Sequence, residues 1–276
     1  MVSTSEPAVP PSEPAPGIGQ DKPGLWRGKV AIVTGAAAGF GAAIAELGAA
    51  EGGDVWLLDV DAAGQAVAEA ITAAGGGPGR FLAVDVTEET QVQRGVSEVL
   101  ARSGRVDIVV NCAGRDSDAD PATMTSEEWD RFMALDLKAS WLTVKAAAGS
   151  MTERGAGSVV NIASLHATLT EEGAFPYAAA KAGLLGLTRS LALDLGPHGI
   201  RVNAVSPGWT RSARVEALFD AIGPEATSRI DQLHALRRTA HPREVAEVAV
   251  FLASDRASFV TGANWAVDGG LGARFA

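Results

Sequence analysis

The chain is poor in cysteine, in clustered histidine and in basic residues, and each shortage excludes a class of protein. Its one cysteine, Cys112, excludes an intramolecular disulfide, and its four histidines are too dispersed for a structural metal site. Acidic residues outnumber basic ones by 33 to 23, and no basic stripe is present that would bind nucleic acid. No run of 18 apolar residues predicts a membrane span. We therefore expect a soluble, cytoplasmic protein without a metal.

Proline is concentrated near the N-terminus, where residues 1–24 hold six of the thirteen. This segment lacks the basic start and the apolar stretch of a signal peptide, so the composition predicts a disordered, solvated tail. Residues 25–276 remain, and their length and the 47% hydrophobic content of the chain fit one domain with a buried core.

Six continuous apolar runs alternate with helical stretches along this domain. Continuous runs are typical of parallel strands that are covered by helices on both faces. The pattern predicts a single-domain α/β protein with a Rossmann-type, doubly wound parallel sheet in a three-layer α/β/α arrangement. The predicted strands are Val30–Val33, Val55–Leu58, Phe81–Val84, Val106–Val110, Ser158–Ile162 and Ile200–Val205.

Two helices have distinctive patterns. Thr125 and Glu128 form a predicted capping box at the start of a long helix. The helix predicted over residues 177–195 is apolar nearly all round, so we expect it to be buried on more than one side, with a partner subunit as its second cover.

A glycine-rich loop follows the first predicted strand. Its glycines permit a tight turn and let a pyrophosphate lie against a helix N-terminus. The loop residues expected at the cofactor are Gly35, Ala38, Gly39, Phe40 and Gly41. Asp59 ends the next strand, 18 residues after Gly41, where its carboxylate can accept both ribose hydroxyls and would repel a 2′-phosphate. The cofactor predicted is NAD.

The only tyrosine, Tyr177, lies four residues before Lys181, one of five lysines, and thirteen after Ser164. Residues i and i+4 share a helix face, so Lys181 should lie beside the phenol and favour its ionised form. Ser164 can hold a substrate oxygen while Tyr177 exchanges a proton with the same oxygen. This spacing indicates alcohol and carbonyl chemistry.

Together these residues resemble the short-chain dehydrogenase/reductase family from about Leu25 to Gly270. The matching motifs are TGxxxGxG from Thr34 to Gly41, an acid at Asp85, NxAG at Asn111–Gly114, the Ser164–Tyr177–Lys181 trio, Pro207–Gly208 and the closing Asp268–Gly270. By this resemblance Asp85 and Val86 would meet the adenine, and the run from Asn111 to Gly114, with Asn111, Ala113 and Gly114, would line the cofactor and stabilise the sheet. Lys181 would also bind the nicotinamide ribose. Pro207 and Gly208, with either Thr210 or Ser212, would hold the carboxamide.

The chain departs from the family pattern at Asp136, where the family usually has the asparagine of its catalytic tetrad. An aspartate keeps the hydrogen-bond acceptor and loses the amide donor. Two interpretations stay open: backbone groups still hold the relay water, or the activity is retuned or lost.

Two further segments concern the substrate side. Asp116, Asp118, Asp120 and Glu127 have calcium-loop spacing, but Pro121 replaces the glycine that such a loop needs, so we expect no metal. Residues 209–238 are predicted to form a mobile lid whose Trp209, Leu218, Phe219 and Ile222 supply apolar walls. His166 could face the substrate, although a lone histidine is more often structural.

The sequence thus predicts an NAD-dependent enzyme that interconverts a secondary alcohol and its ketone, with Ser164, Tyr177, Lys181 and Asp136 as its catalytic residues. Family resemblance implies a homotetramer. The alternatives are a 3-oxoacyl-carrier-protein-type reductase and a weakly catalytic NAD-binding interaction protein.

Overall fold

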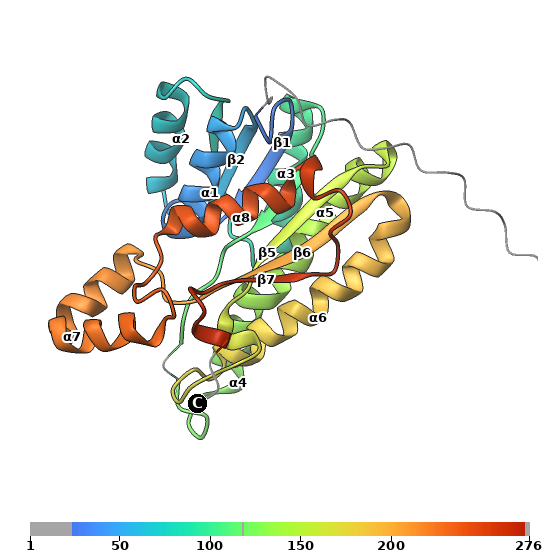
Figure 1. The fold of residues 1–276 in the computed structure, drawn as a ribbon. Coiled ribbons are helices and arrows are strands. Elements are labelled where there is room, and N and C mark those ends of the chain that lie inside the picture. Colours follow the sequence, from blue (N-terminus) through green and yellow to red (C-terminus); the bar gives the residue numbers. More distant parts are fainter. Residues whose placement is uncertain (1–23, 118, 274–276) are drawn as a thin grey trace, which may run out of the picture.

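The computed structural model describes residues 24–117 and 119–273. The predicted N-terminal tail lies outside these ranges except for Gly24. Seven parallel strands form one sheet in the order β3-β2-β1-β4-β5-β6-β7 (Figure 1). The strands are β1 (Val30–Thr34), β2 (Asp54–Asp59), β3 (Gly79–Ala83), β4 (Ile108–Asn111), β5 (Gly157–Ile162), β6 (Ile200–Pro207) and β7 (Asn264–Val267). All six predicted strands are present, and β7 was missed.

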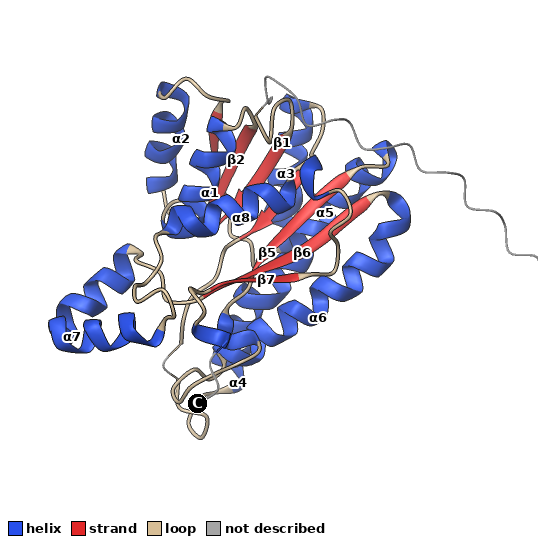
Figure 2. Cartoon of the chain, in the orientation of Figure 1, coloured by secondary structure: helices blue, strands red, loops and turns tan. Residues whose placement is uncertain are grey.

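Helices cover both faces of this sheet, as Figure 2 shows. Helices α1, α2 and α8 pack on one face, while α3, α5 and α6 pack on the other. The bounds of these and the remaining α-helices are α1 (Gly39–Ala50), α2 (Ala63–Ala73), α3 (Glu89–Ser103), α4 (Ser126–Met133), α5 (Ala139–Arg154), α6 (Tyr177–Leu195), α7 (Ala213–Leu233) and α8 (Pro242–Ala253). The predicted three-layer α/β/α fold is confirmed. Within the described ranges, no helix combines the length and the apolar character needed to cross a membrane.

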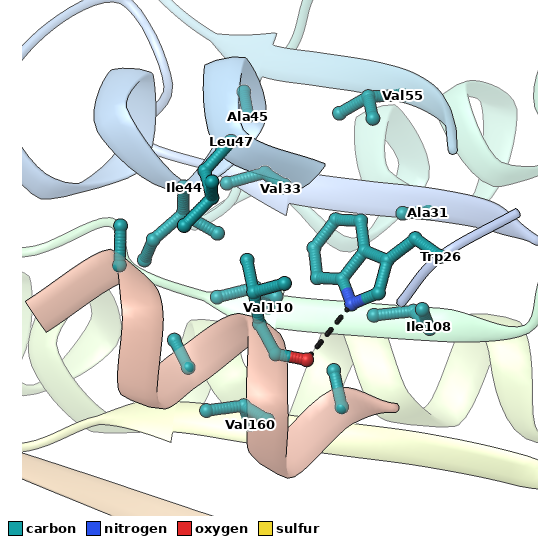
Figure 3. Close-up of a cluster of buried hydrophobic side chains, with 14 of the residues drawn as sticks. Trp26, Ala31, Val33, Ile44, Ala45, Leu47, Val55, Ile108, Val110 and Val160 are labelled. Atoms are coloured by element: carbon teal, nitrogen blue, oxygen red, sulfur yellow. Dashed lines mark hydrogen bonds between the residues drawn. The ribbon is translucent and has the colours of Figure 1, made fainter. Parts of the chain in front are cut away.

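The apolar layer between the sheet and helices α1 and α8 includes a tryptophan from before the first strand. Trp26 is fully buried, and its indole Nε1 donates a hydrogen bond to the carbonyl of Val250 at 3.0 Å (Figure 3). A Cβ at Gly48 would lie 2.1 Å from this ring, so helix α1 needs glycine there to pack on the indole. Trp26 therefore joins α1 to α8 at one end of the sheet.

A π-helical segment, Ala134–Lys138, joins α4 to α5 without a break in the chain of helical turns. The predicted capping box starts α4, since Thr125 Oγ1 accepts from the amide of Glu128 and Glu128 Oε2 accepts from the amide of Thr125. Single-turn π segments inside α-helices are frequent at functional sites. This one carries Asp136.

Within the single chain, helix α6 is buried on only one of its faces. That face includes Leu184, Leu185 and Ala192. Leu193 on the same helix is 78% exposed. The second cover that the sequence predicts for α6 is thus not supplied by the chain itself, and it remains a prediction about assembly.

The strand order reverses between β1 and β4, because β2 and β3 lie on one side of β1 while β4 to β7 lie on the other. In open parallel sheets a crevice forms at such a switch point, outside the carboxyl ends of the strands. The loops that follow β1 and β4 therefore border the expected ligand site.

Candidate active site

A groove of about 1330 Å³ lies at this edge of the sheet. The loops after β1, β2, β3 and β4 line this groove, together with part of the π segment and the start of α7. Most of the predicted cofactor residues line it: Gly35, Ala38, Gly39, Phe40, Gly41, Asp59, Asp85, Val86, Ala113, Gly114 and Ser212.

The loops after β1 and β4 touch each other across the switch point. Gly35 has a φ of +64°, and a Cβ there would lie 2.7 Å from the Cα of Ala113. Thr34 Oγ1 accepts hydrogen bonds from the amides of Cys112 and Ala113, both at 3.1 Å. These contacts fix the two walls of the groove relative to one another.

The N-terminus of helix α1 fits an anionic ligand. Ala38, at its N-cap, supplies no side-chain hydrogen bond, and its first turn contains no acidic residue. The free amide groups and the helix dipole at such an end favour a phosphate. The groove therefore suits the pyrophosphate of a dinucleotide.

Asp59 ends strand β2 and borders the same groove. Its Oδ2 accepts from the amide of Ala37 at 2.9 Å and its Oδ1 accepts from the amide of Asp61 at 3.0 Å. The carboxylate is thus held by backbone donors from two neighbouring loops, in an orientation that does not depend on a bound ligand.

Asn111 has one of its two expected positions: it supports the sheet and does not line the groove. Only 3% of the residue is exposed, and its Nδ2 donates to Asn161 Oδ1 at 2.8 Å and to the carbonyl of Ser140 at 3.2 Å. It does not line the groove. The amide side chain joins β4, β5 and α5, which is the support of the sheet that the resemblance implies.

The three residues predicted to be catalytic come from two adjoining elements. Ser164 follows β5 and caps a short 3₁₀ turn, since its Oγ accepts from the amide of His166 at 3.2 Å. Tyr177 is the first residue of α6, and Lys181 lies one turn later with its Nζ 5.4 Å from the phenol ring centroid. Lys181 is buried, and its Nζ also lies 3.4 Å from the carbonyl oxygen of Ile162.

Two opposing influences act on the pKa of Tyr177. Burial is the larger and raises the pKa above its ordinary value, while the charge of Lys181 and hydrogen bonding with Ser164 lower it. The predicted effect of Lys181 thus has the expected direction, but in the protein alone burial outweighs it. Two carboxylates, Asp116 and Asp136, raise the pKa of the phenol further.

Asp136 lies against Lys181. Only 1% of the residue is exposed, its Oδ1 is 3.4 Å from Lys181 Nζ, and both its oxygens are 3.2 Å from the backbone nitrogen of Arg115, which donates to them. Burial raises the pKa of this carboxyl, and Lys181 opposes that effect. A Cβ at Gly114 would lie 2.7 Å from Asp136 Oδ1, so only glycine leaves room for the carboxylate.

A second cavity, of about 550 Å³, adjoins the groove and is lined by Ser164 and Tyr177 among other residues. Pro207, Gly208 and Thr210 line this cavity rather than the groove, while Ser212 lines both. Thr210 is 3% exposed and its Oγ1 donates to the Gly208 carbonyl at 3.1 Å. Ser212, where the two spaces meet, is the better placed of the two candidate hydroxyls.

The segment predicted as a lid consists mainly of α7, which is kinked at Gly223, where φ is +81°. Trp209 and Leu218 line the second cavity, as the sequence predicts. Phe219 and Ile222 do not: Phe219 is buried with its ring centroid 6.2 Å from that of Trp209, and Ile222 is 40% exposed. The helix period explains the error, because successive residues of α7 point in different directions.

Sequence reasoning missed an ion pair between the lid and the loop after β4. Arg214 Nη1 lies 2.9 Å from Asp116 Oδ2, and both residues border the second cavity. The two positions are 98 residues apart, so no local spacing could have paired them. In the described ranges, no group of three His, Cys, Asp or Glu residues could hold a metal ion.

A groove that suits a dinucleotide, next to a site with Ser164, Tyr177 and Lys181, is typical of the oxidoreductase class of enzymes. Comparisons with known proteins agree. A family model described as "Enoyl-(Acyl carrier protein) reductase" matches residues 35–272. The chain is 36% identical to a cyclopentanol dehydrogenase of Comamonas testosteroni over 80% of this chain and 88% of that protein. It is 38% identical to a 3-oxoacyl-[acyl-carrier-protein] reductase of Thermotoga maritima over 68% of this chain and 75% of that protein.

A solved structure shows the same fold. The crystal structure of a putative short-chain dehydrogenase/reductase from Burkholderia xenovorans has a TM-score of 0.87 and 36% identity, and the match covers 92% of this chain and 100% of that one. The chain belongs to the short-chain dehydrogenase/reductase family. It is an oxidoreductase that acts on CH–OH groups with a nicotinamide cofactor.

Proposed function

We propose that the protein interconverts a secondary alcohol and its ketone with NAD(H). The observation that carries this proposal is that Ser164 and Tyr177 line a cavity that adjoins the groove bordered by Asp59, with the buried Lys181 one helical turn from Tyr177. Ser164 orients the substrate oxygen and Tyr177 exchanges a proton with it.

In the oxidising direction, the alcohol proton passes to the Tyr177 oxygen while a hydride leaves the carbon. NAD, held in the groove bordered by Asp59, would supply the acceptor for that hydride. Lys181 places a positive charge beside the phenol, which favours the phenolate that accepts the proton. Electrons and atoms balance, since the alcohol loses one proton and one hydride.

Charge supports NAD rather than NADP. Asp59 presents a backbone-held carboxylate where an adenosine ribose would lie, and a 2′-phosphate would be repelled there. No arginine or lysine occurs from Ala36 to Phe40 in the adjacent loop. The cations that line the groove come instead from the loop after β4, from α4 and the π segment, and from the lid: Arg115, Arg131, Lys138 and Arg214.

The two rival functions have less support. A carrier-protein reductase docks an acidic partner, whereas this chain carries a net charge of −10. A purely NAD-binding interaction protein does not need the Ser164, Tyr177 and Lys181 constellation, which is present with a cavity beside it. The relative named a cyclopentanol dehydrogenase supports a compact secondary alcohol as substrate.

The direct test follows NADH absorbance with a panel of linear and cyclic secondary alcohols and the corresponding ketones, with NAD(H) and NADP(H) in parallel. We expect turnover of at least one alcohol, with the higher kcat/KM for NAD. A higher kcat/KM for NADP would contradict the cofactor assignment, and no turnover of any alcohol or ketone would contradict the proposed reaction.

A further inference from the structure

The substrate cavity beside Tyr177 is bordered by more acidic than basic side chains. Three carboxylates, from Asp116, Glu171 and Glu172, border it against one guanidinium, from Arg214, so the formal charge of its lining is 1 − 3 = −2 with the histidine neutral. Glu171 and Glu172 belong to the segment between Ser164 and α6.

The one arginine along this cavity is already paired. Arg214 Nη1 lies 2.9 Å from Asp116 Oδ2, and among the cavity's described lining residues no other arginine or lysine occurs. Two cations on elements that border the cavity are also paired: Lys181 with Asp136 at 3.4 Å, and Arg211 with Glu216 at 3.2 Å. An anionic substrate would therefore find no free positive side chain in the cavity.

The rest of the lining is largely apolar, apart from the catalytic hydroxyls and the residues of the short loops. The large apolar side chains include Leu165, Leu169, Trp209, Val215, Leu218 and Leu271. A cavity of about 550 Å³ has the size of a small-molecule pocket, for which the usual range is about 300–1,000 Å³. Its walls can cover a compact hydrocarbon body.

We propose that this cavity selects uncharged substrates with a compact apolar body, and that Asp116 excludes carboxylates by occupying Arg214. The inference rests on the proposed function for the position of the substrate, but it concerns charge selection rather than the reaction. A carboxylate entering the cavity would lose hydration without gaining an ion pair, and it would be repelled by the acidic lining. An alcohol or an amide of the same shape carries no such penalty.

Binding of unreactive ligands tests charge selection independently of turnover. Cyclohexanecarboxamide and cyclohexanecarboxylate have nearly the same shape and differ in charge, so titration calorimetry of each into the full chain with saturating NADH compares the two directly. We expect the amide to bind at least about tenfold more tightly. Equal or tighter binding of the carboxylate, or no binding of the amide, would overturn the proposal.

Substitution of Asp116 tests the mechanism of exclusion. Asp116→Asn removes the partner of Arg214, so the affinity for cyclohexanecarboxylate should rise at least about fivefold while that for the amide stays nearly constant. The double variant Asp116→Asn/Arg214→Gln should lose this gain. Asp120→Asn is the matched control: it lies in the same loop, does not line the substrate cavity, and keeps the acceptor that binds the amide of Ala122.

An unchanged carboxylate affinity in Asp116→Asn, or the same gain in the double variant or in the control, would overturn the role of the Asp116–Arg214 pair. Failure of the proposed function gives a different result. In that case no alcohol is oxidised in the absorbance assay, whereas the two ligands can still be compared by calorimetry.

Discussion

At the scale of single residues, the acidity of Tyr177 depends on charges of opposite sign held within one small site. Lys181 lies one helical turn from the phenol and favours the phenolate, whereas Asp136 partly neutralises Lys181 from a distance of 3.4 Å. Asp116 adds a second negative charge on the side of the substrate cavity. The working pH of the enzyme therefore depends on the balance of these groups rather than on Lys181 alone.

Removal of the phenol hydroxyl tests the role of Tyr177. Tyr177→Phe keeps the ring and deletes the proton-transfer group, so kcat should fall at least about a hundredfold, the lower end of acid–base catalysis. The affinity for NAD, measured by fluorescence quenching, should stay nearly unchanged and serves as the control for folding. Near-normal turnover of the purified variant would exclude the mechanism.

Asp136→Asn tests the balance of charge. Oxidation needs the phenolate, so kcat should rise with pH as Tyr177 loses its proton. Removing the negative charge of Asp136 leaves Lys181 uncompensated, which stabilises the phenolate and lowers its pKa. The rise in kcat should therefore move to lower pH by roughly one unit, with a smaller effect on substrate KM. The measurement is a pH profile of kcat for both proteins.

The alternative for Asp136 predicts a different profile. If backbone groups alone hold the relay water and the carboxylate is structural, the pH profile of Asp136→Asn overlays that of the wild type and turnover is unchanged. The conservative size of the substitution keeps the fit against Gly114, so a loss of fold would not explain a shifted profile.

Cofactor preference has its own test at Asp59. Asp59→Ser with Ala38→Arg removes the carboxylate that would repel a 2′-phosphate and adds a cation in the adjacent loop. The ratio of kcat/KM for NADP to that for NAD should rise at least about tenfold over the wild type. The control is Glu69→Ser, at an exposed acid of α2 that does not line the groove. An unchanged ratio in the Asp59 variant would show that Asp59 does not determine the choice between NAD and NADP.

Local spacing explains which site residues could be predicted. Tyr177 and Lys181 share a helix face, so their proximity follows from the sequence alone. The contact between Asp136 and Lys181, and the pair formed by Asp116 and Arg214, depend on how distant segments meet. Asn111 belongs to a matching motif, yet only the packing of β4 against β5 and α5 shows that its side chain points away from the groove.

At the scale of secondary structure, five of the six predicted strands were recognisable because each is a continuous apolar run that is largely buried. The sixth, β3, is an edge strand that is only partly buried, yet it still overlaps the apolar run Phe81–Val84. Strand β7 was missed because it is a short edge strand whose Asn264, Trp265 and Ala266 are exposed. An edge strand lacks the two-sided burial that makes its neighbours so apolar. The π segment was also beyond prediction, since one extra residue in a helical turn leaves no mark in a 3.6-residue pattern.

The packing of Trp26 between α1 and α8 leads to a prediction about stability. Trp26→Ala would leave a large cavity and remove the hydrogen bond to the Val250 carbonyl, so it should lower the free energy of unfolding by about 3–5 kcal/mol. Urea denaturation followed by circular dichroism measures the change. Leu236→Ala, at a leucine that is 66% exposed, is the control and should have little effect. A loss under about 1 kcal/mol for Trp26→Ala would show that the site collapses around the smaller side chain.

At the scale of the whole molecule, large apolar side chains remain exposed on one chain. They include Leu193 of α6, Trp141 of α5, and Phe259 and Trp265 near the β7 edge, with exposures of 78%, 40%, 103% and 39%. Exposed apolar surface of this kind marks sites where other proteins pack. Because it occurs on the face of α6 and on the edge strand, more than one type of subunit contact is available, which favours an assembly larger than a dimer.

We therefore expect a dimer or, by family resemblance, a tetramer in solution, with the outer face of α6 in a subunit contact. Light scattering at micromolar concentration should give a multiple of the 28.2 kDa chain mass. Leu193→Glu should shift the protein toward smaller species, because an unpaired charge would have to lose its hydration when the subunit contact forms. Leu236→Glu, at a leucine that is 66% exposed outside α6, is the matched control and should keep the wild-type mass. A 28.2 kDa particle for the wild type would refute the assembly, and an unchanged mass for Leu193→Glu would exclude this face of α6 from the contact.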